Sequence, residues 1–94
     1  MLFVIHAEDH PGAVATRLAH YDAHKAYLSG AAVKSVVSGP LLSEDGETMI
    51  GSLFIVEADS RGEVVAFNAA DPFAAAGVWA EVRIHPFLKR VDNR

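Results

Sequence analysis

The spacing of apolar and polar residues changes along the chain, and each spacing predicts a particular element. Short apolar runs and strict alternation indicate β-strands, whereas apolar positions three and four residues apart indicate amphipathic helices. From these patterns we expect strands at residues 2–7, 31–37, 48–57 and 78–85, and helices at residues 13–28 and 61–70. The predicted order of elements is therefore βαββαβ.

The last predicted strand has two chemically different faces. Its positions are Val78, Ala80, Val82 and Ile84 on one side and Trp79, Glu81, Arg83 and His85 on the other. An alternation with a period of two residues is typical of a strand whose faces meet different surroundings. Gly77, just before this strand, permits the sharp reversal of the chain that the strand needs.

Glycine and proline mark the turns between the central elements. Asp45-Gly46 is typical of the turn of a hairpin between the second and third strands. Pro40 has no backbone N–H, so the second strand must end there or lie at an edge of the sheet. Gly51 lies inside the third strand and indicates a bulge or the close approach of another group.

In the first helix the apolar residues form a stripe that we expect to face the core. The stripe consists of Val14, Leu18, Tyr21 and Leu28. Ser29-Gly30 ends this helix. The inward residues of the second helix are expected to be Val64, Val65 and Phe67. Residues 58–60, which include Ser60, offer its N-cap.

A βαββαβ order predicts an α+β, ferredoxin-like fold, in which a four-stranded antiparallel sheet carries both helices on one face. The other face of the sheet is then uncovered, and one set of the alternating residues of the last strand lies on it. An uncovered sheet face with aromatic content needs a partner. We therefore predict a homodimer that packs sheet on sheet.

Composition limits the classes of function. The 94 residues are enough for one domain, expected to span residues 1–94, and 51% of them are hydrophobic. Lys and Arg number 8 against 12 acidic residues, a net charge of −4, so nucleic acid is not an expected partner. The absence of cysteine excludes disulfides and thiolate chemistry. No apolar run approaches the ~20 residues that span a membrane, so we expect a cytoplasmic protein without membrane contact.

His24 and Asp71 are the candidates for acid–base chemistry. A carboxylate that accepts a hydrogen bond from one imidazole nitrogen fixes the tautomer and leaves the other nitrogen to move a proton. The first helix and the turn after the second can meet at one end of the sheet in this fold. Asp71 also precedes Pro72, so the alternative is that Asp71 caps a short helical turn and His24 is exposed.

Two further residues share a flank of the first helix with His24. Arg17 could bind a carboxylate or an enolate oxygen with its planar fork, or form a solvated ion pair with Glu8 or Asp9. His20 lies four residues before His24, a spacing that can hold a metal ion. Asp71 or His6 could complete the ligand set only if folding brings them to the pair, so we favour the interpretation without a metal.

The stretch Ser38-Gly39-Pro40 at the end of the second strand offers a hydroxyl and backbone donors to a pocket. Glycine and proline at such a place are more often ordinary turn residues. Both interpretations stay open on the pattern alone.

Several stretches together resemble the YciI-like, or YCII-related domain, family. They are residues 1–5, Arg17-Leu18 with His24 and Leu28, Ser38-Gly39-Pro40, Gly51-Ser52-Leu53-Phe54, residues 71–79 and Pro86-Phe87. The segment from Asp71 to Trp79 is the most specific of these. The resemblance implies a ferredoxin-like fold in the dimeric α+β barrel superfamily and an active site whose His–Asp pair falls on His24 and Asp71. Arg17 matches an arginine of the family, whereas His20 has no counterpart.

The favoured function is that of a small enzyme without a cofactor. His24, oriented by Asp71, would move a proton on a small cyclic or enolisable metabolite in a lyase or isomerase reaction. Arg17 and residues 38–40 would bind the substrate. The resemblance extends to muconolactone isomerase and to dehydrochlorinases of hydroxylated aromatic rings. The alternatives are a non-catalytic, small-molecule-binding or accessory dimer and a purely structural dimer that has no cleft.

Overall fold

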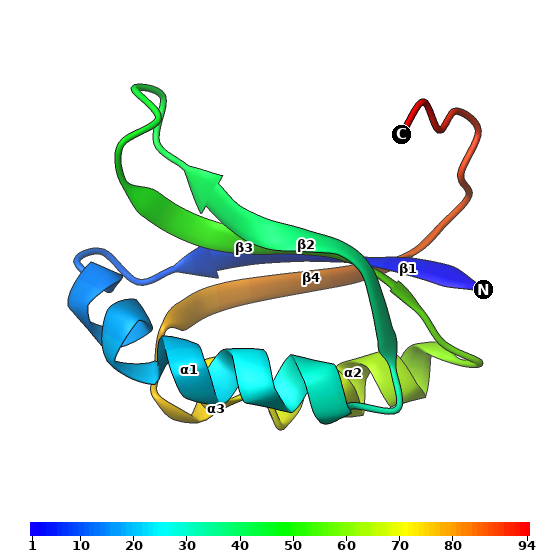
Figure 1. Cartoon of the computed structure of the whole chain (residues 1–94), viewed down its shortest axis with the longest axis horizontal. Coiled ribbons are helices and arrows are strands. Elements are labelled where there is room, and N and C mark those ends of the chain that lie inside the picture. The colour runs from blue at the N-terminus through cyan, green and yellow to red at the C-terminus, as the bar shows by residue number, and fades with distance from the viewer.

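A computed structural model describes all 94 residues. Its elements are β1 (Leu2–Asp9), α1 (Val14–Gly30), β2 (Lys34–Leu42), β3 (Met49–Glu57), α2 (Arg61–Ala69), α3 (Pro72–Ala75) and β4 (Trp79–Phe87). The strands form one antiparallel sheet in the order β2-β3-β1-β4. All helices lie on the same side of this sheet (Figure 1). The predicted α+β, ferredoxin-like architecture is confirmed, and the short α3 adds to the two predicted helices.

The hydrophobic core lies between the sheet and the helices. Every second residue of β1 points into it, because Phe3, Ile5 and Ala7 are all buried. The rest of this core includes Phe54 and Val56 from β3, Val64 and Phe67 from α2, and Phe73 from α3. Full burial of such a side chain contributes about 1.5–3 kcal/mol to folding. This layer therefore holds the helices against one face of the sheet.

A bulge in β4 changes the face on which Trp79 lies. Glu8 pairs with Glu81 and the next residue, Asp9, pairs with Trp79, so that Ala80 has no partner on β1. Because one extra residue reverses the alternation, the Trp79 side chain turns to the helix side and is buried in the core. Plain alternation places Trp79 with Glu81 and Arg83, and that prediction is wrong.

Strand β2 is longer than its apolar pattern predicts. It continues through Ser38-Gly39-Pro40 to Leu42 and forms an edge of the sheet. Of the two alternatives for Pro40, the edge position is therefore right, since an edge strand tolerates a missing donor. The hairpin turn contains Gly46 at a φ of 76°, and Gly77 before β4 has a φ of 74°. Both glycines occupy the left-handed region that other residues avoid.

The inner face of α1 differs from the predicted stripe. Leu18 and Tyr21 are 63% and 49% exposed, whereas the relative exposures of Arg17 and His24 are only 5% and 8%. The polar side chains can point inward because each has an acidic partner beneath it, which the helix pattern by itself does not reveal. In α2, Val64 and Phe67 are buried as predicted, but Val65 is exposed.

The second face of the sheet is not covered by any helix. Its apolar part includes Leu2 of β1, Val37 of β2, Ile55 of β3 and Phe87 of β4, which line a shallow depression together with the C-terminal residues 89 and 91–94. Figure 1 shows this tail on the side of the sheet opposite to the helices. None of the helices is long and apolar enough to cross a membrane.

Candidate active site

His24 of α1 and Asp71 before α3 are joined by hydrogen bonds. The imidazole Nδ1 lies 2.9 Å and 2.8 Å from the two carboxylate oxygens, and both side chains are buried. A carboxylate only accepts, so Nδ1 carries the hydrogen and Nε2 keeps its lone pair. Nε2 has no hydrogen-bond partner in the chain, and it is not among the buried polar atoms without a partner. The free nitrogen is therefore accessible.

Asp71 also caps the short helix that follows it. Its Oδ1 accepts a hydrogen bond of 2.8 Å from the backbone N–H of Phe73, and Pro72 occupies the first helical turn. The two alternatives for Asp71, helix cap and partner of His24, are thus geometrically compatible. The proline keeps Asp71 extended, and the cap then fixes the direction of the carboxylate.

Aromatic rings hold the imidazole in place. The ring of His24 stacks on Phe73 with a centroid distance of 4.0 Å and an interplanar angle of 6°. Phe54 meets it edge-on at 6.0 Å. With Nδ1 bound to Asp71 and one face covered by Phe73, the ring is held in one orientation, and its Nε2 has no partner in the chain.

Arg17 precedes His24 on α1, and its side chain is hydrogen-bonded to residues of β1 and β3. Its Nε donates to Asp9 at 2.5 Å, and its Nη2 donates to the backbone oxygen of Gly51 at 2.5 Å and to the hydroxyl of Ser52. The predicted ion pair with Asp9 exists, but it is buried rather than solvated. A buried pair needs further hydrogen bonds to offset desolvation, and Gly51 and Ser52 supply them.

One nitrogen of the Arg17 guanidinium has no hydrogen-bond partner in the chain. Nη1 makes no hydrogen bond in the chain and is not an enclosed atom. The guanidinium carbon lies 5.0 Å from the centroid of the Phe73 ring. Arg17 therefore offers a fixed, positively charged donor next to His24.

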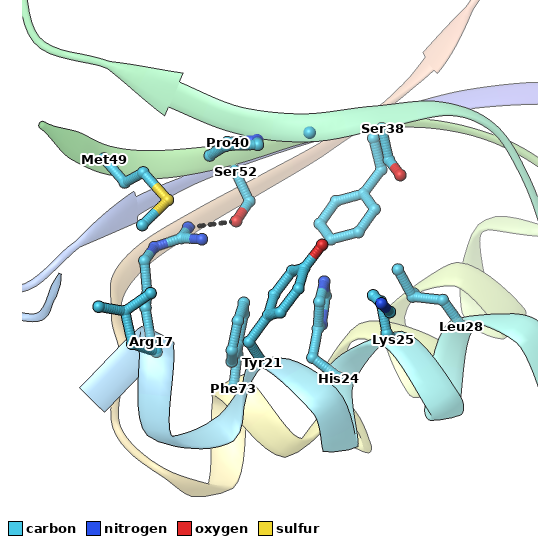
Figure 2. Close-up of a pocket in the computed structure, with 13 residues that line it drawn as sticks. Arg17, Tyr21, His24, Lys25, Leu28, Ser38, Pro40, Met49, Ser52 and Phe73 are labelled. Atoms are coloured by element: carbon cyan, nitrogen blue, oxygen red, sulfur yellow. Dashed lines mark hydrogen bonds between the residues drawn. The ribbon is translucent and has the colours of Figure 1, made fainter. Parts of the chain in front are cut away.

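A cleft of about 220 Å³ lies between α1 and the strands β2 and β3. Arg17 and His24 line its helix side, and residues 38–40 line it from β2 (Figure 2). A cavity of about 150 Å³ accepts benzene, so this cleft has room for a six-membered ring with small substituents. Tyr21 stands between His24 and Arg17 in Figure 2 and borders the space toward solvent.

The structure brings five of the six residues singled out in the sequence into this cleft, and Asp71 lies behind His24. His20 is exposed and makes no hydrogen bond. No three or more His, Asp or Glu side chains gather in an arrangement that could hold a metal ion. Ser52 and Phe73 also line the cleft, and the sequence pattern did not point to either of them. Ser52 could have been found as a polar residue at an inward-facing position of β3, between Gly51 and Phe54.

Tyr27 of α1 is hydrogen-bonded to the backbone of α2. Its hydroxyl donates a hydrogen bond of 2.7 Å to the backbone oxygen of Phe67. Burial raises the pKa of the Tyr27 phenol, and the negative charge of Asp71 raises it further. The phenol therefore stays neutral beside the carboxylate.

Comparison with known proteins identifies the family. A model of the YCII-related domain matches residues 1–88. The chain belongs to the YCII-related domain family. Protein YciI of Escherichia coli is 33% identical over 95% of this chain and 98% of its own length. An uncharacterised protein of Haemophilus influenzae is 31% identical over the same shares of the two chains.

A solved structure in the family is similar over nearly the whole chain. The 5-chloro-2-hydroxyhydroquinone dehydrochlorinase TftG of Burkholderia phenoliruptrix is 38% identical, covers 94% of both chains and superposes with a TM-score of 0.80. That structure is a complex with 2,5-dihydroxybenzoquinone. A NIPSNAP domain protein of Burkholderia xenovorans, 18% identical with a TM-score of 0.51, shares the fold alone.

Proposed function

We propose that this protein is a small enzyme in which His24 moves a proton on a hydroxylated or enolisable ring. The observation that carries the proposal is the bond of 2.8 Å from Nδ1 of His24 to Asp71, with Nε2 free beside a cleft of ring size. The similarity to a dehydrochlorinase that was solved with a dihydroxyquinone supports the choice of substrate class. The reaction type is then an elimination or an isomerisation.

The chemistry follows from the protonation states of the site. Neutral His24 takes a proton from a ring hydroxyl or an adjoining carbon at Nε2, and Asp71 stabilises the imidazolium that results. The electron pair left on the ring forms a carbonyl or a ring double bond. In an elimination the carbon–chlorine bond breaks as that double bond forms, and chloride leaves with the bonding pair of the carbon–chlorine bond, so that the proton and chloride together account for HCl. In an isomerisation His24 returns the proton to another atom.

Arg17 supplies the electrostatic part of the reaction. Its Nη1 has no partner in the chain, and the guanidinium is fixed by Asp9 and by β3. A preorganised donor costs no reorganisation when negative charge develops on a ring oxygen. Residues 38–40 form the opposite wall and set the width of the cleft.

Chloride release from 5-chloro-2-hydroxyhydroquinone tests the proposal. The rate of chloride release from this compound should be higher with the protein than in buffer alone. His24→Ala should lower kcat by about 10²–10⁴-fold, which is the usual contribution of a general base. The Lys89→Ala variant, outside the cleft, serves as the control. If the protein does not accelerate release from this or any other ring substrate, the enzymatic proposal is wrong.

The alternative of a non-catalytic binder makes a different prediction for His24→Gln. Glutamine keeps a hydrogen-bonding group but cannot exchange a proton near neutrality. Under the enzymatic proposal this variant binds a ring ligand and does not turn it over. If the parent protein binds such ligands tightly without converting any of them, the binding function replaces the catalytic one.

We also propose that the protein is a homodimer formed through the open face of the sheet. The face exposes Val37 and Phe87 beside the half-buried Leu2 and Ile55. A contiguous apolar surface of this kind is stabilised when a second copy covers it. The cleft lies on the other side of the sheet and stays open in such a dimer.

A further inference from the structure

The permanently charged side chains on the walls of the cleft are both cations. Arg17 and Lys25 line it, and none of the other lining residues is acidic. A second depression, which shares Lys25, Leu28 and Ser38 with the cleft, has no Asp or Glu in its lining either. The chain as a whole has the opposite balance, with 12 acidic residues against 8 Lys and Arg. The cleft is therefore a positively charged region of an acidic protein.

The two cations of the cleft differ in whether the chain balances their charge. Arg17 is paired with the buried carboxylate of Asp9. Lys25 forms no ion pair, although Asp22 lies three residues before it on the same helix. Asp71 is 1% exposed, and its oxygens already accept hydrogen bonds within the chain. The charge of Lys25 is thus left for an anion that comes from outside the chain.

The ammonium group of Lys25 is folded back along α1 toward the cleft. Its Nζ lies 5.2 Å from the centroid of the Tyr21 ring, and Tyr21, one turn earlier on the helix, borders the cleft. A cation over an aromatic face is attracted by the ring quadrupole. This contact favours a position of the ammonium beside the cleft and close to His24, where Figure 2 shows Lys25.

Ser38 faces Lys25 from the other wall of the cleft. It lies on β2 opposite Phe54 of β3, and cross-strand partners point to the same side of a sheet. Phe54 is buried under the helices, so Ser38 points to the helix side as well, and Figure 2 shows its hydroxyl directed toward α1. This hydroxyl has no hydrogen-bond partner in the chain and is not an enclosed atom. An ammonium and a hydroxyl on facing walls are donors that one carboxylate can bridge.

We infer that Lys25, together with the Ser38 hydroxyl, binds a carboxylate carried by the ring substrate, so that Lys25 determines substrate specificity. The substrate class narrows to hydroxylated or enolisable rings with an acidic substituent. The ring lies against Nε2 of His24, and the substituent points away from Arg17, which precedes Lys25 by eight residues, or about 12 Å of helix. The inference rests on the proposed function, because this ring is the one from which His24 takes a proton.

The expected contribution of Lys25 to affinity is modest because its side chain is exposed. An ion pair at such a position changes a dissociation constant by up to about fivefold. Salt screens exposed charges, so the contribution should fall as the ionic strength rises. The competing explanation is that Lys25 is an ordinary solvated side chain and that Arg17 alone meets any anionic group of the ligand. Substitution of Lys25 then changes no affinity.

The test compares two ring probes that differ only in a carboxylate. 2,5-Dihydroxybenzoate and hydroquinone have the same pair of hydroxyls, and their dissociation constants are measured by titration at low salt. The parent protein should bind the benzoate more tightly. Lys25→Gln should weaken the benzoate by about fivefold and leave hydroquinone unchanged. Lys89→Gln, the same substitution outside the cleft, should change neither.

Charge reversal and salt provide a second readout. Lys25→Glu should bind 2,5-dihydroxybenzoate more weakly than hydroquinone, because like charges then meet at the end of the cleft. In the parent protein the preference for the benzoate should shrink at high salt. Gln and Glu are good helix formers, so both variants should keep α1 intact, and thermal unfolding checks this.

Three results would overturn the inference. If the parent protein binds both probes and Lys25→Gln leaves the ratio of their dissociation constants unchanged, Lys25 does not contact the carboxylate, while the proposed function stands. Equal weakening of both probes means that Lys25 acts on the shape of the cleft and not through its charge. If the parent protein binds neither probe, both the inference and the proposed ring substrate are wrong.

Discussion

Asp71 carries out two tasks with one carboxylate. It caps α3 through the N–H of Phe73 and orients His24 through Nδ1. The tasks differ in what they require, since a cap needs only an oxygen acceptor whereas the tautomer of His24 depends on a group that cannot donate. Substitution by the isosteric amide separates them.

We predict that Asp71→Asn keeps the fold and loses activity. The amide oxygen can still accept from Phe73, which leaves the NH₂ group against Nδ1 of His24. Nδ1 must then accept, the hydrogen moves to Nε2, and the base is lost, with an expected fall in kcat of about 10²-fold or more. Steady-state kinetics and thermal unfolding check this.

Asp71→Ala serves as the matched variant, and it should lose activity and about 1 kcal/mol of stability together. Full activity in Asp71→Asn would contradict the role assigned to the carboxylate.

Tyr27 gives a prediction about pH. Burial raises the pKa of the Tyr27 phenol above its usual value, and the negative charge of Asp71 raises it further. The stability that this shift contributes is complete below the unfolded pKa, about 10, and is lost as pH rises through the folded pKa, because only the unfolded chain releases the proton in between. Tyr27→Phe should therefore lose less stability than the parent between pH 9 and about 11.

Urea unfolding at several pH values measures this slope, and Tyr21→Phe, at an exposed position, is the control. The Tyr27→Phe variant also lacks the bond to Phe67, so the slope with pH, not the stability at neutral pH, is the readout. Parallel curves for Tyr27→Phe and the parent would contradict the shift.

At the scale of single residues the sequence was informative where a residue type is rare for its surroundings. His24, Asp71 and Arg17 are chemically distinctive, and resemblance to a family assigned them to a site. The burial of Arg17 and His24 could not be predicted from the helix pattern. Their buried partners, Asp9 and Asp71, come from other parts of the chain. Ser52 was missed because its two donors come from α1 and β4.

At the scale of elements, Gly51 shows how two strands come unusually close. A Cβ atom at this position would lie 2.4 Å from the backbone oxygen of Ala7. The sequence predicted either a bulge or a close approach here, and the close approach exists. Gly51 also presents its own oxygen to Arg17.

Gly51→Ala should consequently destabilise the fold, because β1 and β3 must move apart and Arg17 loses part of its support. The expected cost is about 1–3 kcal/mol, which is typical of overpacking in a dense interior. Chemical denaturation measures it.

Gly39→Ala in β2 is the matched control, since no atom lies within 4 Å of its added Cβ, and it should be neutral or slightly stabilising. Equal stability of the two variants would mean that the strands separate without cost.

The order and type of the elements could be predicted from the apolar pattern, but their irregularities could not. Residues 31–37 were expected as the second strand, and β2 in fact extends from Lys34 to Leu42 because its edge position tolerates Pro40. The bulge at Ala80 depends on the pairing of β1 with β4, which only the folded sheet defines. Plain alternation along one strand contains no information about such a shift.

At the scale of the whole molecule, the two faces of the sheet have separate roles in our account. The helix side holds the cleft, and the open side is assigned to a second copy of the chain. The assembly stays a prediction that a single substitution can test.

Val37→Glu should shift the protein from dimer to monomer, because it places a charge in the proposed interface, where burying that charge costs desolvation energy. Sedimentation equilibrium or light scattering gives the mass in solution.

Val65→Glu is a close control, since the two valines are 45% and 40% exposed but lie on opposite sides of the molecule. A parent protein that is monomeric, or a dimer that survives Val37→Glu unchanged, would overturn the proposed assembly.

The measurement that tests the central claim most directly is the exchange of ring hydrogens of 2,5-dihydroxybenzoquinone in D₂O, followed by proton NMR. It detects proton transfer itself and needs no leaving group. The parent protein should accelerate exchange, whereas His24→Gln should bind the probe and accelerate it about 10²-fold less or not at all. Exchange at the parental rate in His24→Gln would show that another group moves the proton.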